Sequence, residues 1–205
     1  EKMLYDNALL VSLYADAYLV TKNPLYKDVV TETLEYIKKE MTANNGAFYS
    51  SLDADSNNAE GKLVEGAYYV WTEAELKTLL KDDFDLFSEY YNINDYGFWE
   101  HDNYVLIRKD DDATILKKFN LSENQLAEKK QLLKSTLSAV RNKRNKPRLD
   151  DKTLTSWNAL MLKGYVDAYR VFGDKNYLEA AEKNAKFIIN NQLRKDGGLN
   201  HNYKD

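Results

Sequence analysis

The sequence has no cysteine, which excludes disulfide bonds and thiol chemistry and is consistent with a cytoplasmic protein. It also has no apolar run long enough to span a membrane. Basic residues form no long block and the formal net charge is −4, so neither nucleic acid nor an anionic membrane is expected as a partner. The nearest basic run, residues 141–148, is interpreted as the solvated end of a helix. The only two histidines, His101 and His201, occur in unrelated positions, so no zinc site is predicted.

Aromatic residues are frequent, at 13% of the chain, with 16 tyrosines, seven phenylalanines and three tryptophans. Hydrophobic residues make up 43% and charged residues 30%, which is a globular composition. A chain of this length can bury one sizeable core, and no clear linker is visible, so we predict a single domain over residues 1–205. The aromatic side chains can fill that core or line a cavity that stacks on sugars, and composition does not separate the two.

The chain contains an internal repeat. Residues 7–54 align without a gap on residues 158–205, at an offset of 151. Identical residues are far more numerous than the roughly three expected by chance. The identical pairs include Asn7/Asn158, Ala8/Ala159, Leu9/Leu160, Tyr14/Tyr165, Asp16/Asp167, Ala17/Ala168, Tyr18/Tyr169, Val20/Val171, Tyr26/Tyr177 and Gly46/Gly197. We therefore predict two copies of one supersecondary unit.

Each copy is predicted to be a helical hairpin, at residues 4–54 and 155–205. The first helix of the first copy, about residues 4–21, is apolar nearly all round, which is typical of a helix buried on more than one side. The second, about residues 24–42, has one charged face. One buried and one amphipathic helix per unit suit a two-layered ring. The long loops then gather at the end where the inner helices begin, and function is expected there.

Between the copies the pattern changes to short strands, at about residues 64–108. We interpret this segment as an insertion with a small β-hairpin. Residues 103–108 are expected to pair with residues 66–71 as a small sheet. Helix starts are predicted at Thr72, with a capping box to Glu75, and at Ser122.

Three motifs occur in order: EKMLYDNA, GAFYSSLDADSNNAEGKLVEGAYYVWTEAEL and RLDDKTLTSWNALM. They resemble the spermatogenesis-associated protein 20-like family over essentially the whole chain. The resemblance implies the central part of an (α/α)6 toroid, similar to six-hairpin glycosidases and sugar 2-epimerases, in which sugar binds at the long-loop end. It also implies an N-terminal thioredoxin-like domain in the full-length protein. The predicted fold class is mainly α: a partial (α/α)6 toroid of helical hairpins with a small β-hairpin insertion.

Carboxylates at the long-loop end are the candidate catalytic groups. Cleavage of a glycosidic bond, or epimerisation, needs a pair of acid–base groups facing one cavity. Asp6 and Asp151 precede the inner helices at repeat-related places and form the first candidate pair, with Asp150 beside them. His201, in the long loop of the second copy, is a further candidate base or sugar-hydroxyl partner. The competing interpretation is structural, because an Asp before a helix is a common N-cap that stabilises the helix by about 1 kcal/mol.

Candidate substrate-binding residues fall at the same predicted end. They could stack on a sugar or bind its hydroxyls, and packing beneath the loops is an equal alternative. The set is Tyr5, Tyr49, Asp53, Asp55, Glu65, Tyr68, Trp71, Trp157 and Asn158. No cofactor or metal site is predicted, because the DADSNNAEG loop lacks the glycine offset and the final glutamate of an EF-hand.

Two functional hypotheses remain. The first is a domain that binds or processes a carbohydrate, of glycosidase or epimerase type, and the sequence leaves open whether it is an enzyme. It predicts a cavity with two or more carboxylates within about 10 Å of one another. The second is a non-catalytic interaction scaffold whose partner is the thioredoxin-like domain of the same full-length chain. It predicts a funnel plugged by the protein's own aromatic side chains.

Overall fold

The computed structural model describes residues 1–204, which form two compact units. Unit 1 consists of Glu1–Ala54 and the segment that begins at Arg148, and unit 2 is Asp55–Pro147. The predicted insertion at about residues 64–108 is therefore the middle of a larger compact unit. That both units together make one domain stays a prediction.

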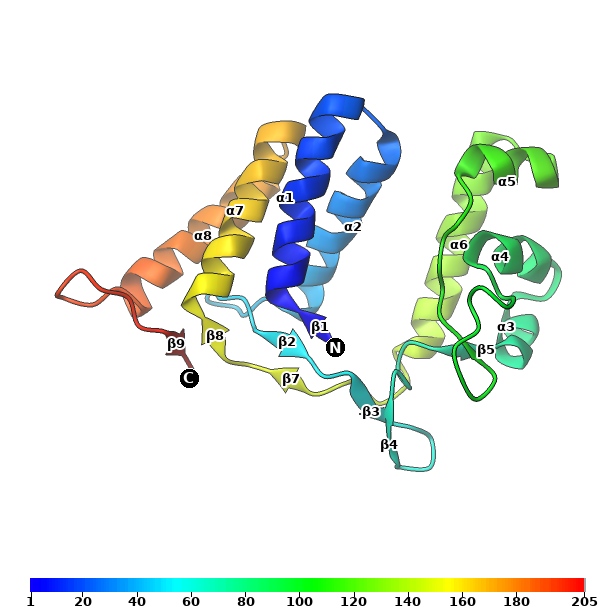
Figure 1. Ribbon diagram of the computed structural model, residues 1–205, viewed down its shortest axis with the longest axis horizontal. Coiled ribbons are helices and arrows are strands. Elements are labelled where there is room, and N and C mark those ends of the chain that lie inside the picture. The colour runs from blue at the N-terminus through cyan, green and yellow to red at the C-terminus, as the bar shows by residue number, and fades with distance from the viewer. Residues whose placement is uncertain (205) are drawn as a thin grey trace. The chain divides into compact units, whose positions relative to one another are not determined.

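Unit 1 contains two helical hairpins, with short strands at the end where α1 and α7 begin (Figure 1). The helices are α1 (Leu4–Thr21), α2 (Pro24–Glu40), α7 (Thr155–Phe172) and α8 (Lys175–Asn191). The strands are β1 (Lys2–Met3), β2 (Ser51–Leu52), β7 (Leu149–Asp150), β8 (Thr153–Leu154) and β9 (Asn202–Tyr203). Antiparallel pairing gives one sheet in the order β1-β2-β7 and a separate β8-β9 pair. The prediction of a mainly α fold built from helical hairpins is confirmed.

The helices of each hairpin are joined by tight turns, as predicted from their turn-forming residues. Asn23 caps α2, because its side chain accepts a hydrogen bond from the backbone N–H of Leu25 at 3.0 Å. Asp174 caps α8 in the same way, accepting from the N–H of Asn176 at 2.9 Å. Gly173 ends α7 with a φ of 70°, a left-handed conformation that suits glycine at a helix end.

The two copies repeat each other in backbone hydrogen bonding as well as in sequence. Bonds that hold the loop of the first copy recur 151 positions later in the second. The matched bonds, N–H donor first, are Leu4 to Ser50 with Thr155 to His201, Ala43 to Ala47 with Arg194 to Gly198, Gly46 to Ala43 with Gly197 to Arg194, and Tyr49 to Met41 with Asn200 to Gln192. The internal repeat is therefore a repeat of structure.

The core of unit 1 lies between α1 and α7, which pack side by side, each also against its own second helix (Figure 1). On α1 the buried residues are Leu4, Ala8, Val11 and Ala15. The sequence predicted burial of this helix on more than one side. The opposite side instead remains exposed, because among the described residues only α7 and α2 pack extensively on the helix.

Unit 2 is built from short strands and five helical segments around two apolar clusters. Its helices are α3 (Glu73–Leu80), the 3-10 helix η1 (Lys81–Asp83), α4 (Phe84–Tyr91), α5 (Asp112–Phe119) and α6 (Glu123–Arg141). Its strands are β3 (Asp55–Asn57), β4 (Leu63–Glu65), β5 (Trp71–Thr72) and β6 (Asn103–Tyr104). The predicted capping box of Thr72 with Glu75 and the Ser122 cap are confirmed. A β-hairpin is formed by β3 and β4, which lie almost entirely before the predicted insertion at about residues 64–108.

The expected strand over residues 64–71 is interrupted. Gly66 has a φ of 69°, and its carbonyl accepts hydrogen bonds from the N–H groups of Tyr69 and Val70, so the chain turns there. The expected sheet with residues 103–108 is reduced to two pairs, Trp71 with Tyr104 and Thr72 with Asn103.

Among the residues that the structure describes, none of the helices has the length and apolar character needed to cross a membrane.

Candidate functional site

A polar pocket lies at the loop end of unit 1, where β2 pairs with β7. The antiparallel register sets Ser51 opposite Asp150 and so joins two segments about a hundred residues apart in sequence. The pocket has a volume of about 310 Å³. Its lining residues are Glu1, Ser51, Asp53, Arg148, Leu149 and Asp150. Two of these, Asp53 and Asp150, are predicted site residues.

Asp53 is held by Arg148. The guanidinium donates to Oδ2 of Asp53 from Nη2 at 2.8 Å and from Nε at 3.2 Å. The backbone N–H of Asp53 also donates to the carbonyl of Arg148 at 2.9 Å. Because both backbone and side chains are joined, the carboxylate and the guanidinium have a defined position at the pocket, although Arg148 itself is largely exposed.

Asp150 and Asp151 are each paired with a lysine. Asp150 lies in β7 and forms an ion pair of 3.1 Å with Lys152. Asp151 is exposed and forms one of 2.9 Å with Lys204. The hydrogen bond and positive charge of Lys204 lower the pKa of Asp151 below its ordinary value. At neutral pH Asp151 is therefore a carboxylate, which can act as a base or accept hydrogen bonds but cannot donate a proton.

Asp6 lies in the first turn of α1, and His201 lies in the loop beside the start of α7. Asp6 is exposed in the first turn of α1, where the helix dipole favours a negative charge. His201 is also exposed, and its backbone carbonyl accepts a hydrogen bond from the N–H of Thr155 at the start of α7. The backbone of His201 is therefore fixed at the loop end.

Two predicted aromatic residues meet between the inner helices. The rings of Tyr5, on α1, and Trp157, on α7, have centroids 4.8 Å apart and are tilted by 60°. Both side chains are half-buried, so each keeps some surface for contact. Tyr49 is also half-buried, and its backbone N–H donates to Met41. The Tyr5–Trp157 pair is thus an aromatic surface in the first turns of both inner helices.

Four predicted residues belong to unit 2. Asp55 and Glu65 face each other across the β3–β4 pair. Tyr68 is buried and donates through its hydroxyl to Asn142 at 3.3 Å. Trp71 is only 2% exposed, and the guanidinium of Arg144 lies 4.0 Å from its ring centroid. In the structure these two rings are core and packing residues of unit 2.

Asn158 is the most constrained of the predicted residues, since it is fully buried. Its Oδ1 accepts from the backbone N–H of Phe48 at 2.8 Å, and its Nδ2 donates to the carbonyl of Phe48 at 2.9 Å. Nδ2 also donates to Leu154, and Asn184 donates to Oδ1. Because both polar atoms are engaged, Asn158 works as a clamp that fastens the first copy's loop to α7.

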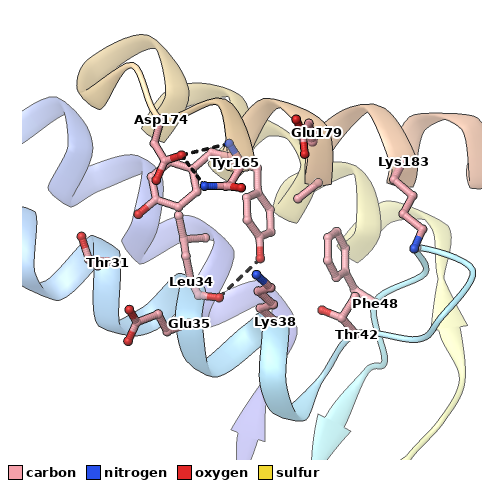
Figure 2. A pocket seen from close by; sticks show the side chains of 14 residues that line it. Thr31, Leu34, Glu35, Lys38, Thr42, Phe48, Tyr165, Asp174, Glu179 and Lys183 are labelled. Atoms are coloured by element: carbon pink, nitrogen blue, oxygen red, sulfur yellow. Dashed lines mark hydrogen bonds between the residues drawn. The ribbon is translucent and has the colours of Figure 1, made fainter.

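A second cavity, of about 460 Å³, forms a groove between α2 and α8 (Figure 2). Leu34, Phe48 and Tyr165 are buried along it, and the rings of Phe48 and Tyr165 stack at 5.5 Å. The Tyr165 hydroxyl donates weakly to the carbonyl of Leu34, at 3.4 Å, and burial raises the pKa of Tyr165 so that its phenol stays protonated. The groove was not predicted, because its walls come from hairpins far apart in sequence.

Known proteins resemble this chain in sequence. It is 32% identical, over 92% of its length, to human spermatogenesis-associated protein 20, and equally to the uncharacterized protein B0495.5 of Caenorhabditis elegans. The resemblance to spermatogenesis-associated protein 20 is confirmed. The chain spans 26% of the human protein and 28% of the nematode one, about a quarter of the length of these relatives. No protein-family model matches the chain.

Solved structures resemble it only weakly. A D-mannose isomerase aligns over 99% of the chain and 46% of its own length, with 14% identity and a TM-score of 0.30. The cellobiose 2-epimerase of Bacillus thermoamylovorans B4167 aligns over 98% and 64%, with 13% identity and a TM-score of 0.27. At such scores neither structure supports an assignment of function, and closure of the hairpins into a toroid stays a prediction.

Within this chain, related to spermatogenesis-associated protein 20, sequence reasoning missed Arg148 and Ser51. From the motif RLDDK only the two aspartates are predicted site residues, and Arg148 is interpreted as part of the basic run at residues 141–148. A signal was available, because Arg148 directly precedes the strand that carries Asp150 and therefore belongs with the loop end.

Proposed function

We propose that unit 1 binds a carbohydrate at its loop end. The observation that carries the proposal is the convergence of Asp53, Arg148 and Asp150 on one pocket from segments far apart in the chain. Fixed carboxylates and guanidinium groups suit the hydroxyls of a sugar, since they accept and donate strong hydrogen bonds. The pocket volume of about 310 Å³ is at the lower end for small-molecule sites, which fits a monosaccharide unit.

The aromatic pair at the same end supports a sugar rather than a smaller polar ligand. Tyr5 and Trp157 are in contact and half-buried, so a ring face can meet the apolar face of a pyranose. Both residues lie in first turns of inner helices, the end of unit 1 at which β2 and β7 also lie.

Catalysis at this end is a further part of the proposal. Asp150 and Asp151 are the candidate bases, and for Asp151 the hydrogen bond from Lys204 lowers the pKa and so favours the carboxylate. Asp6 and His201 are candidate partners. A glycosidase or epimerase also needs a proton donor, and His201 is the candidate for that role because imidazole commonly gives and takes protons in catalysis.

Binding is tested by titrating the chain with glucose, mannose, N-acetylglucosamine and cellobiose while recording its NMR amide spectrum. At least one sugar should shift resonances of residues 51–53 and 148–151. Arg148→Ala should weaken that binding on the order of tenfold, the loss expected for a charged hydrogen bond. Arg194→Ala is the matched control, because Arg194 pairs with Asp196 in the corresponding loop of the second copy.

The proposal fails if no sugar binds the unaltered chain, or if both arginine variants bind as tightly as it does.

Turnover is followed separately by NMR of the sugar itself over hours. Asp150→Asn and Asp151→Asn should each abolish any conversion while the Arg194→Ala rate stays unchanged.

The second candidate function is a non-catalytic scaffold for the thioredoxin-like domain of the full-length protein, located in the cytoplasm. One observation favours it: Asp53, Asp150 and Asp151 are each paired with a cation, as in a structural ion-pair network. This candidate predicts that the thioredoxin-like domain, added separately, shifts loop-end resonances and that no sugar does. A sugar-dependent shift lost in Arg148→Ala would contradict it.

A further inference from the structure

The groove between α2 and α8 is a second place in unit 1 with the build of a ligand site. Its walls are the second helices of the two hairpins, and Leu34, Phe48 and Tyr165 are buried along its floor (Figure 2). Walls and floor therefore all come from two hairpins that pack on each other through α1 and α7. The volume of about 460 Å³ is in the range of small-molecule sites, and the groove shares no lining residue with the loop-end pocket.

The floor of the groove presents aromatic rings. Those of Phe48 and Tyr165 are stacked, with centroids 5.5 Å apart and an angle of 10° between their planes. Tyr177, on the α8 wall, lies against Tyr165 with centroids 6.2 Å apart and a tilt of 59°. Rings in such positions favour offset or edge contact with a further ring. The floor thus suits a ligand that carries an aromatic side chain.

Each wall of the groove carries a glutamate followed by a lysine. On α2 these are Glu35 and Lys38, and on α8 they are Glu179 and Lys183. Both helices run toward the loop end, so on each wall the carboxylate precedes the ammonium group in the same direction (Figure 1, Figure 2). Within residues 1–204 none of these four side chains forms an ion pair or a hydrogen bond. Two charges of each sign are therefore available to a ligand.

Lys183 is held in the groove by the loop that follows α2. A glutamate four residues before a lysine favours an ion pair on a helix. Glu182 and Lys186 form such a pair at 3.9 Å, whereas in the described chain Glu179 and Lys183 do not. The stem of Lys183 instead lies against the loop, since a Cβ at Gly46 would come within 2.6 Å of its Cγ. This packing directs the ammonium group toward the loop end of the groove (Figure 2).

We propose that the groove binds a zwitterion of dipeptide size with an aromatic side chain. The ring packs on Phe48 and Tyr165, the amino group faces Glu179, and the carboxylate faces Lys183. The spacing fits a dipeptide, because three or four residues of helix separate glutamate from lysine by about 5–6 Å, and two extended residues span about 7 Å. A free amino acid carries both charges on one carbon and matches this separation less well.

Binding is tested by titrating the isotope-labelled chain with glycyl-phenylalanine while recording its NMR amide spectrum. Saturable shifts are expected for residues 42–48 and 176–183, and not for residues 51–53 and 148–151. Glycyl-phenylalanine that is acetylated at its N-terminus and amidated at its C-terminus has no charge. It should bind on the order of tenfold more weakly or worse, since its charged hydrogen bonds are lost. Glycyl-glycine, which lacks the ring, should also bind more weakly.

Two variants test the charges of the α8 wall. Glu179→Gln and Lys183→Gln should each weaken binding of the dipeptide on the order of tenfold. Glu182→Gln and Lys186→Gln are the matched controls, because this pair has the same spacing on the same helix but lies outside the groove. Both controls should bind like the unaltered chain. All four residues are exposed, so circular dichroism should show every variant folded.

Three results would overturn the proposal. The first is the absence of saturable shifts up to about 10 mM dipeptide, a concentration at which even millimolar affinity is visible. The second is equal binding of the uncharged dipeptide, which would indicate an apolar groove that accepts any peptide segment, including one of the full-length protein. The third is equal weakening in Lys183→Gln and Lys186→Gln, which would indicate a general effect of charge on α8.

Discussion

The two hairpins of unit 1 have the same hydrogen-bond framework and different surroundings. Every loop bond compared above recurs at an offset of 151, yet Phe48 is buried and Leu199 is exposed at the equivalent place. The local sequence of a copy therefore determines how its loop is built. The neighbour that packs against the copy determines how much of the loop is buried, and so how much stability each residue contributes.

The charged residues at the loop end also differ between the two copies, because acid and base exchange places. In the first copy an acid, Asp53, is bound by Arg148. The equivalent position in the second copy is a base, Lys204, and it binds Asp151. Both partners come from the short segment 148–151, so one segment supplies a cation to one copy and an anion to the other.

The largest difference in stability between the two copies is expected at the apolar loop residues Phe48 and Leu199. Phe48→Ala should lower the free energy of unfolding by about 3–5 kcal/mol, because a buried aromatic ring leaves a cavity. Leu199→Ala should change it by about 0.5 kcal/mol, as for an exposed side chain. Urea denaturation at concentrations where the chain is monomeric measures both. Equal losses would show that Leu199 is buried in solution.

The next largest difference in stability is expected between Asn158 and its repeat-related counterpart Asn7. Asn158→Ala leaves the N–H and C=O of Phe48 without partners in the core, so a loss of about 3 kcal/mol is expected. Asn7→Ala removes one bond, to Met3, and should cost about 1 kcal/mol. The same denaturation experiment applies. A loss for Asn158→Ala no greater than that for Asn7→Ala would contradict the clamp.

The loop glycines give a smaller, sterically defined difference. Gly46 and Gly197 have φ values of 92° and 84°, so alanine at either should cost about 1 kcal/mol of backbone strain. A Cβ at Gly46 would also lie 2.6 Å from Cγ and 3.1 Å from the backbone oxygen of Lys183, whereas nothing lies within 4 Å at Gly197. Gly46→Ala should therefore lose about 1 kcal/mol more. Thermal unfolding of the two variants measures this, and equal values would count against the packing of this loop on α8.

The smallest effect concerns the exposed pair of Asp151 and Lys204. The pKa of Asp151 is lowered by Lys204, so this pair stabilises the fold above the ordinary aspartate pKa. Its contribution is lost as pH falls through the lower folded-state pKa. NMR titration of the carboxyl carbon should show the lowered pKa, which returns toward the ordinary value in Lys204→Gln and at high salt. Lys195→Gln, in the same loop, should leave it unchanged, and an unchanged pKa in Lys204→Gln would exclude the pair.

Much of unit 1 was predictable from sequence. The repeat, the helical hairpins, the tight turns and the gathering of long loops at one end follow from local patterns of spacing and turn residues. The predicted burial of α1 on more than one side does not hold, since Leu9, Leu10 and Leu13 are exposed.

The site was less predictable. Asp53 and Asp150 were named, but Arg148 was not, because its pairing with Asp53 depends on a strand register between segments 95 positions apart. Tyr68 and Trp71 were predicted at the loop end, but both are buried in unit 2.

The sequence by itself determined the hairpin and its loop, since helix periodicity, caps and left-handed glycines act over a few residues. The tertiary structure decided which copy is covered. Asn7 and Asn158 stand in the same Asn-Ala-Leu motif, and each donates to the carbonyl four residues before it. Within residues 1–204 only Asn158 binds a loop, because in that range only α7 has a hairpin packed on this face. The local sequence of either copy does not determine packing between distant segments.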